Sequence, residues 1–224
     1  MLACLGLYRW DPGWAGTELH TAPGERRTLA LADESRITLD ADSRLRVQRH
    51  LFSRRVQLLQ GRARFSVVHS GWRRFQVDAG AVQVRNYGTV FDVSRQGARS
   101  EVTLWRGSVG VQAGGQARRL QPGQRVEAGP QGIGAVHSSE GAQADWPQGR
   151  LQFSATPLSQ VLAELQRHHP GRIVLDDPAL GQLAVSGVFD SDRSASALAL
   201  QPQILPVVLQ PGDDGSVHVR ARLQ

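Results

Sequence analysis

Apolar side chains recur at every second position in a long series of short segments between Arg26 and Val126. A period of two is typical of strands with one face in a core, and Gly or Asp/Ser clusters separate these segments at hairpin spacing. The segments are residues 27–33, 36–41, 44–50, 55–69, 73–80, 81–86, 89–97, 100–115 and 124–129. The pattern predicts an all-β domain over residues 20–130, either a sandwich or a solenoid-like meander.

One stretch departs from this alternation. Residues 84–93 (VRNYGTVFDV) read as a single strand that Tyr87-Gly88-Thr89 interrupts in the middle. A glycine inside a strand weakens it and marks a bulge, a bend or a close approach of backbone. The stretch itself leaves these three explanations open.

The composition changes after residue 130. Residues 131–146 are rich in Gly, Ser and Gln and are predicted to be a linker. Residues 147–224 then predict a small α+β domain in the order β-α-β, β-α-β-β, which makes the whole chain mainly β. Thr156 is expected to cap the first helix, with Pro157 at the first helical position. Ser191 or Asp192 is expected to cap the second helix.

The uneven distribution of charge along the chain supports a division into two domains. All 26 basic residues are arginine, with 20 against 11 acidic residues in positions 1–130 and 6 against 9 in positions 131–224. The basic part contains adjacent arginine pairs, but neighbours on a strand point to opposite faces, so the pairs need not form one stripe. No nucleic-acid-binding fingerprint accompanies them, and we predict solvated strand faces rather than a nucleic-acid partner.

Residues 1–19 resemble the end of a membrane helix followed by a juxtamembrane segment. A short apolar run, residues 2–7, precedes Tyr8, Trp10 and Trp14, and aromatic residues collect where a spanning helix meets the headgroups. An unstructured N-terminus is the alternative. The single cysteine, Cys4, cannot form an internal disulfide.

Catalytic and metal-binding patterns are weak. His168-His169 is the one histidine cluster, and the negative end of a helix dipole explains it adequately. Asp176-Asp177-Pro178 is typical of a turn after a strand. No nucleophile-base signature or phosphate-binding loop is present, so we expect no ordinary enzyme, no metal site and no cofactor.

Five motifs in the first domain resemble the FecR-type periplasmic domain of bacterial anti-sigma regulators. They are TAPGERRTLALADESRITLDADSRL, RRVQLLQGRARFSVV, RRFQVDAG, VRNYGTVFDV and VTLWRGSVGV, in the family's order over about residues 20–126. Glu34 departs from the usual glycine of the first turn. The second domain resembles the short secretin/TonB N-terminal (STN) fold through LQFSATPLSQVLAEL, IVLDDPAL and VSGVF. Pro202 departs from that pattern and is expected to truncate the second helix.

The resemblance implies a role in iron-related cell-surface signalling. In such regulators a cytoplasmic segment binds an extracytoplasmic-function sigma factor, and one helix crosses the inner membrane of a Gram-negative bacterium. The periplasmic part binds the N-terminal signalling domain of an outer-membrane TonB-dependent transducer loaded with ferric siderophore or haem. We expect this chain to be the periplasmic part, without a sigma-binding segment, and envelope proteases are further partners that the resemblance suggests.

The α+β domain is predicted to carry the partner surface, because a small open sheet leaves strand edges that accept another chain's strand. The residues assigned to this surface lie in segments 183–189 and 206–210: Leu183, Val185, Val188, Phe189, Val207 and Leu209. A place in the core is the alternative for Leu183, Val185 and Val188. One alternative is an envelope domain that binds a small ligand or glycan, with Trp72 or Trp105 as anchors. Another is a structural module of a secretion or export assembly.

The resemblance also implies a reaction at Gly88-Thr89. Some members of the family cleave themselves at the matching Gly-Thr pair by an N-to-O acyl shift, in which the threonine hydroxyl attacks the preceding carbonyl. Glycine can adopt the distorted backbone that this attack needs, and threonine supplies the nucleophile. A purely structural glycine followed by an ordinary strand threonine is the alternative.

Overall fold

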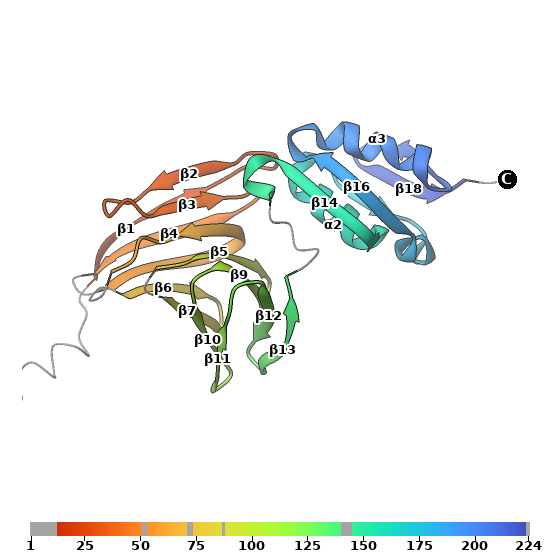
Figure 1. Cartoon of the computed structure of the whole chain (residues 1–224). Helices are drawn as coiled ribbons and strands as arrows, with labels where there is room; N and C mark the ends of the chain where they lie inside the picture. The colour runs from red at the N-terminus through yellow and green to blue at the C-terminus, as the bar shows by residue number, and fades with distance from the viewer. Residues whose placement is uncertain (1–12, 51–52, 71–73, 87, 140–144, 223–224) are drawn as a thin grey trace, which may run out of the picture. The chain divides into compact units, whose positions relative to one another are not determined.

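The computed structural model describes residues 13–50, 53–70, 74–86, 88–139 and 145–222. The chain forms two compact units (Figure 1). The β unit comprises Met1–Thr21 and Arg26–Glu140, and the α/β unit comprises Ala22–Glu25 and Gly141–Gln224. None of the helices within the described ranges is long and apolar enough to cross a membrane.

The described part of the β unit is a single continuous sheet of 13 strands. The strands are β1 (Gly13–His20), β2 (Arg27–Ala30), β3 (Arg36–Leu39), β4 (Arg44–His50), β5 (Ser53–Ser66), β6 (Arg74–Ala79), β7 (Val82–Asn86), β8 (Val90–Gln96), β9 (Arg99–Arg106), β10 (Val109–Ala113), β11 (Gln116–Leu120), β12 (Gln124–Gly129) and β13 (Gly132–Ser138).

Strand β5 divides this sheet into two faces. Its first half pairs with β4 and β6, and its second half, from Gly61 onward, pairs with β3 and β8. The first face therefore has the order β11-β10-β7-β6-β5-β4-β1, and the second has the order β2-β3-β5-β8-β9-β12-β13. The two faces enclose one core, so the predicted all-β domain is confirmed as a sandwich in which β5 is the shared corner strand.

Gly61 makes the corner of β5 possible. Its φ of +84° lies in the left-handed region that only glycine adopts without strain. A Cβ built on Gly61 would lie 2.6 Å from the Cα of Ser43, well inside van der Waals contact. The hydroxyl of Ser43 in turn accepts a 3.0 Å hydrogen bond from the Arg62 backbone N–H, which secures the residue after the bend.

Three phenylalanines from both faces meet at the centre of the β core. The ring of Phe65 lies 5.9 Å from that of Phe75 and 5.1 Å from that of Phe91. Phe75 belongs to the first face, and Phe91 belongs to the second. All three side chains are fully buried, so alternation along each strand places its apolar residues between the faces.

The strands predicted within residues 27–129 are present in the structure. Three other strands, β1, β11 and β13, were not predicted. Part of the predicted linker 131–146 is regular structure instead, because β13 occupies Gly132–Ser138 and Trp146 is buried in the α/β unit. Strand β11 was missed because four of its five residues are exposed, which leaves no alternation to read. Residues 13–19, assigned to the juxtamembrane segment, form most of β1, which pairs with β4; residues 1–12 lie outside the described residues.

The α/β unit confirms the predicted β-α-β, β-α-β-β order. It contains β14 (Arg150–Pro157), α2 (Leu158–His168), β15 (Ile173–Leu175), β16 (Ala184–Asp190), α3 (Ser194–Ile204), β17 (Val207–Pro211) and β18 (Val217–Ala221), with short 3-10 helices η1 (Trp146–Gln148), η2 (Pro178–Gln182) and η3 (Ser191–Arg193). Strands β14 and β16 form one small sheet, and β15, β18 and β17 form another. Helix α2 packs Leu158, Val161, Leu162 and Leu165 into the core of this unit, and α3 adds Ala197 and Leu198.

The expected helix ends are wrong in detail. Helix α2 begins at Leu158, with Pro157 as its N-cap, and the Thr156 hydroxyl bonds back to Ser154 instead. The cap near the second helix is Asp190, whose carboxylate accepts the Asp192 backbone N–H and starts η3. Helix α3 also continues through Pro202 to Ile204, because a proline so near the C-terminus removes only one hydrogen bond of the last turn.

The corner of β5 gives a test of this architecture. We expect Gly61→Ala to lower the free energy of unfolding by about 2–4 kcal/mol, because the new Cβ adds a clash with Ser43 to the left-handed strain. Gly97→Ala is the matched control, since Gly97 has a φ of +59° but open space around its Cβ position. We expect that change to cost only about 1 kcal/mol in urea unfolding. Equal losses for the two variants would contradict the corner role.

Candidate functional site

Gly88-Thr89 lies at a crossover between the two faces of the β unit. Strand β7 ends at Asn86 on the first face, and β8 begins at Val90 on the second. The interpretation of residues 84–93 as one interrupted strand was therefore wrong. The alternation of apolar residues belongs to two strands, β7 and β8. The chain leaves one face and joins the other here, and Tyr87 lies outside the described residues.

The backbone around this crossover is tightly packed. A Cβ on Gly88 would lie 2.6 Å from the Cα of His69, so a side chain at this position is excluded. On the other side, a Cβ on Gly107 would lie 2.9 Å from the Gly88 carbonyl oxygen and 2.7 Å from Cγ2 of Thr89. Of the three explanations for Gly88, the structure thus supports a close approach of backbone. Sequence reasoning missed His69 and Gly107, because each is far from Gly88 in the chain and Gly107 signals only a turn.

Thr89 is held by its backbone, and its hydroxyl is buried. Its side chain and backbone together are only 3% exposed, and its carbonyl accepts a 2.9 Å hydrogen bond from the Val67 N–H. The hydroxyl oxygen Oγ1 has no hydrogen-bond partner among the described residues. A buried hydroxyl without a partner costs about 1–3 kcal/mol, so this arrangement is unusual for a purely structural threonine.

The predicted partner residues of the α/β unit divide into two groups. Val185, Phe189 and Val207 are 1%, 7% and 0% exposed, and Leu183 and Leu209 pack against the same core. Burial therefore counts against Val185, Phe189 and Val207 as partner contacts, whereas Leu183 and Leu209 are only partly buried and their assignment stays a prediction. Val188 is the exception at 65% exposed.

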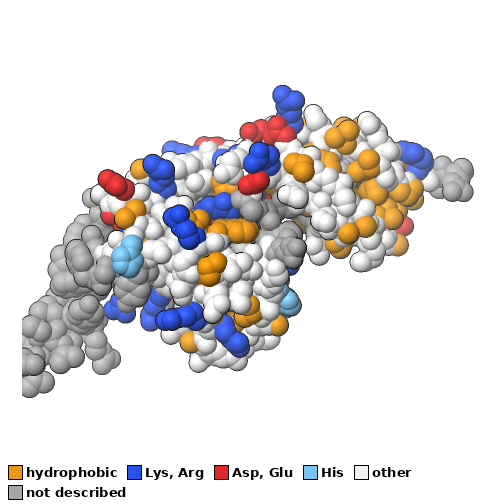
Figure 2. Space-filling view, viewed as in Figure 1, with side chains coloured by type: hydrophobic (Ala, Val, Ile, Leu, Met, Phe, Trp, Pro, Cys, Tyr) orange, Lys and Arg blue, Asp and Glu red, His pale blue; other side chains and the backbone are white. Residues whose placement is uncertain are grey.

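The strand edges in this unit are open, as predicted. Within the described residues β16 pairs only with β14, and β17 pairs only with β18. Besides Val188, the large exposed apolar side chains of this unit are Leu200 at 43% and Ile204 at 53%, one turn apart on α3. Figure 2 shows hydrophobic side chains gathered over the visible face of this unit, whereas arginines are prominent over the β unit.

Only one of the two tryptophans proposed as ligand anchors, Trp105, lies within the described residues. Trp105 lies on a strand face, where the guanidinium of Arg64 stacks 5.2 Å from its ring centre. Arg64 also makes a bidentate ion pair with Asp92, at 2.6 and 2.7 Å. Trp105 therefore has the structural role of a strand-face residue, and Trp72 lies outside the described residues.

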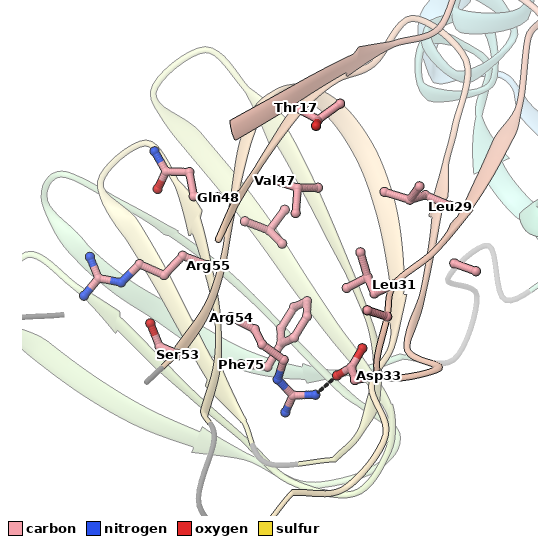
Figure 3. A pocket seen from close by; sticks show the side chains of 13 residues that line it. Thr17, Leu29, Leu31, Asp33, Val47, Gln48, Ser53, Arg54, Arg55 and Phe75 are labelled. Atoms are coloured by element: carbon pink, nitrogen blue, oxygen red, sulfur yellow. Dashed lines mark hydrogen bonds and ion pairs between the residues drawn. The ribbon is translucent and has the colours of Figure 1, made fainter. Parts of the chain in front are cut away.

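The β unit instead has a cavity of about 450 Å³ at one end of the sandwich (Figure 3). Its walls come from β1, β4, β5 and β6 of the first face and from β2 and the turn after it on the second. The apolar lining includes Leu29, Leu31, Val47, Val56 and Phe75. This volume is in the range of ligand sites and exceeds ordinary packing defects.

An ion pair closes one end of this cavity. The Asp33 carboxylate bonds Arg54 and accepts a 3.0 Å hydrogen bond from the Ser35 hydroxyl, while the Arg54 guanidinium lies 5.3 Å from the centre of the Phe75 ring. Burial alone would raise the pKa of Asp33, but the hydrogen bonds from Arg54 and Ser35 and the charge of Arg54 lower it below its ordinary 3.8. Glu34, at the tip of this turn, has a φ of +66°, a conformation that glycine adopts with less strain.

The polar clusters of the α/β unit have structural roles. The Asp177 carboxylate accepts the Ala179 N–H at 2.9 Å and starts η2, which confirms the predicted turn. Asp176 bonds Arg220 and His218, and these hydrogen bonds lower its pKa. His169 bonds Gly171 through Nδ1 at 3.0 Å, and His168 is buried.

Comparison with known proteins decides what the β unit is. Residues 17–110 match the family model described as FecR protein. This part of the chain is a FecR domain. The match spans the Gly88-Thr89 crossover, Gly107 and the cavity, and it ends within β10.

Two crystal structures resemble the whole chain. Each is described as a putative anti-sigma factor from Parabacteroides distasonis, with TM-scores of 0.78 and 0.76 and sequence identities of 22% and 23%. Each alignment covers 92% of this chain and 99% of the other. The likeness shows that this chain shares its fold with these structures. No curated protein matches the chain.

The ion pair in the FecR domain predicts a pH dependence. Because the folded state lowers the pKa of Asp33, the pair stabilises the fold above the ordinary pKa of 3.8 and loses this effect as the pH falls through the lower folded value. We therefore expect Asp33→Asn to destabilise the domain at pH 7 by roughly 0.5–1.5 kcal/mol, since the pair is partly exposed. The loss should shrink at pH 3 and below in urea unfolding.

Asp42→Asn is the control for this experiment, because its side chain only accepts a hydrogen bond from Gln60, which an amide oxygen can still accept. A pH-independent effect of Asp33→Asn, or an equal effect of the control, would contradict the prediction.

Proposed function

We propose that this chain is the periplasmic signal-receiving region of an anti-sigma regulator. The observation that carries the proposal is the FecR match combined with a fold that aligns with 99% of two structures described as putative anti-sigma factors. In this role the chain receives a signal in the envelope, and a cytoplasmic segment of the same regulator relays it to an extracytoplasmic-function sigma factor.

The partner that delivers the signal is, in this proposal, the N-terminal signalling domain of a TonB-dependent outer-membrane transducer for a siderophore or haem. The α/β unit, with its STN-like element order, is the receiving surface. Strands β16 and β17 each have an edge that no described strand covers, and such edges accept a strand of another chain. Val188, Leu200 and Ile204 supply exposed apolar area on the same unit.

A second candidate activity is self-cleavage between Gly88 and Thr89, and the buried, unpartnered Thr89 hydroxyl is the observation that favours it. Thr89 Oγ1 attacks the Gly88 carbonyl carbon, the peptide C–N bond breaks, and an ester with a free Thr89 amine forms. Water then hydrolyses the ester to a Gly88 carboxylate and the Thr89 hydroxyl. Because Gly107 has no side chain, it leaves room beside the Gly88 carbonyl oxygen for the change in geometry that the attack requires.

The transducer interaction predicts the effect of one substitution. We expect Val188→Arg in the whole chain to weaken binding of the transducer's isolated N-terminal domain at least tenfold, because a charge replaces an exposed apolar contact beside the β16 edge. The domain for this test comes from a TonB-dependent transducer whose gene neighbours that of the regulator, and isothermal titration calorimetry measures the affinity. Val68→Arg, at the 43% exposed Val68 of the FecR domain, should leave binding within twofold.

If Val68→Arg weakens binding and Val188→Arg does not, the receiving surface lies on the FecR domain instead. Absence of any binding by the unmodified chain would overturn the choice of transducer as partner.

Self-cleavage predicts two fragments that remain associated under native conditions, since β7 and β8 share one core. We expect denaturing electrophoresis and intact mass to give fragments ending at Gly88 and beginning at Thr89. Thr89→Ala should remain full length, while Thr89→Ser, which keeps a hydroxyl, should still cleave. A single full-length species for the unmodified chain after days at neutral pH would contradict the activity and leave Gly88 with its packing role alone.

A further inference from the structure

The outer surface of the first face of the FecR domain carries a row of arginines. The neighbouring row of paired residues, which includes Val56 and Val84, is buried in the core. Because side chains alternate along a strand, the next row points outward. Figure 3 shows its member Arg55 directed away from Val47 and Phe75, out of the sandwich. From β11 to β4 the row consists of six residues paired in register: Arg119, Gly110, Arg85, Gln76, Arg55 and Gln48.

The three arginines of this row lack acidic partners. Within the described residues no carboxylate forms an ion pair with Arg55, Arg85 or Arg119. The Nε of Arg55 is shielded from solvent and has no hydrogen-bond partner there. Arg85 makes a long 3.4 Å contact from its Nε to the Gln76 amide oxygen. The guanidinium groups of the row are therefore left with donors that an external anion can use.

The acidic side chains of the first face are engaged with other residues. Asp78 accepts hydrogen bonds from the amides of Gln76 and Gln83, both at 2.9 Å. Glu18 pairs with Arg46 at 2.9 Å. Neither carboxylate neutralises the arginine row, so the row keeps its positive charge.

The second face has a different charge arrangement. Three arginines that point outward from it each form an ion pair with a carboxylate: Arg62 with Asp40, Arg64 with Asp92 and Arg125 with Glu101. Glu127 lies opposite Glu101 on the neighbouring strand and adds a further negative charge. The two outer surfaces of the sandwich are therefore unlike, and the unpaired positive charge lies on the first.

The spacing of the row leaves room for anionic groups between its arginines. Adjacent strands lie about 4.8 Å apart, so Arg55, Arg85 and Arg119, each two strands from the next, are spaced by about 10 Å. Gly110 separates Arg85 from Arg119, and a Cβ on it would have no neighbour closer than 3.9 Å apart from its chain neighbours. A phosphate group over Gly110 would be within reach of both guanidinium groups, which bind phosphate oxygens bidentately.

The lack of exposed apolar side chains favours a membrane over a protein partner. Within the described residues Val68 is the large apolar side chain that the β unit exposes, and it follows the half of β5 that pairs with the second face. Protein interfaces combine an apolar core with a polar rim. The phosphate layer of an anionic membrane attracts arginine by charge alone, so it needs no apolar contact.

We propose that the outer surface of the first face, through Arg55, Arg85 and Arg119, binds the phosphate groups of an anionic phospholipid membrane. The contact turns the second face of the FecR domain away from the membrane. That this membrane is the inner membrane rests on the proposed function. The binding itself does not involve the transducer, so failure of the membrane contact and failure of the transducer interaction are separate results.

The test measures sedimentation of the whole chain with lipid vesicles. Charged vesicles contain phosphatidylcholine and about one third phosphatidylglycerol. Vesicles of phosphatidylcholine alone measure any contribution of the apolar run at residues 2–7. Each arginine near an anionic surface strengthens binding about fivefold, so we expect at least tenfold tighter binding to the charged vesicles at about 0.1 M salt. Most of this difference should disappear at about 0.5 M salt, because salt screens the charges.

Two double variants locate the contact. Arg85→Gln with Arg119→Gln removes two exposed charges of the row and should weaken binding to the charged vesicles at least tenfold. Arg36→Gln with Arg99→Gln is the matched control, because both arginines are exposed on strands of the second face, β3 and β9, and the loss of net charge is the same. The control should stay within twofold, since its charges lie farther from the membrane than the Debye length of about 10 Å. Circular dichroism checks that both variants are folded.

The proposal is overturned if the unmodified chain binds the two kinds of vesicle equally. Equal losses for the two double variants would show attraction by net charge and would also overturn it. An acidic polypeptide is the other possible occupant, and polyglutamate is the probe for it. If polyglutamate binds more tightly than the charged vesicles at equal negative charge, and the row variant loses that binding, the surface serves an acidic polypeptide and the membrane assignment is wrong.

Discussion

The bend of β5 at Gly61 is the constraint on which the FecR domain depends. One strand of 14 residues serves both faces, so the register of β4 and β6 on one side and of β3 and β8 on the other is set by the same backbone. The left-handed glycine and its contact with Ser43 turn the strand by a defined amount. The three central phenylalanines can meet only because both faces leave this corner at a fixed angle.

The same arrangement explains where the candidate sites lie. The sheet bends once, at β5, so its outermost strands meet at two ends of the sandwich. Within the described residues no strand pairing joins β1 to β2, and the cavity and the free edge of β2 lie at this end. The chain must also cross between faces, and it does so at Gly88-Thr89, where His69 and Gly107 approach so closely that only glycine fits. The strand connections of the fold therefore explain the positions of both the cavity and the Gly88-Thr89 crossover.

The two units offer different chemistry to partners. The α/β unit presents apolar side chains beside short strand edges, while the FecR domain presents an apolar cavity. The strand edges are suited to recognise an extended chain, because unpaired backbone groups provide affinity and alternate side chains provide specificity.

Alternation of apolar residues was sufficient to predict the central strands, and helix periodicity predicted the order of the α/β unit, because these signals depend only on neighbours in the chain. The edge strand β11 was not predicted, because an exposed strand has no buried face and so shows no alternation of apolar and polar residues. Alternation also could not say which side of β16 faces a core, and the structure buries Val185 and Phe189 and exposes Val188. The sequence by itself determined local structure and the FecR-type motifs. Only the tertiary structure decided that Gly61 is a corner, that Gly88 lies at a crossover and that β2 has an open edge, because each depends on residues distant in the chain.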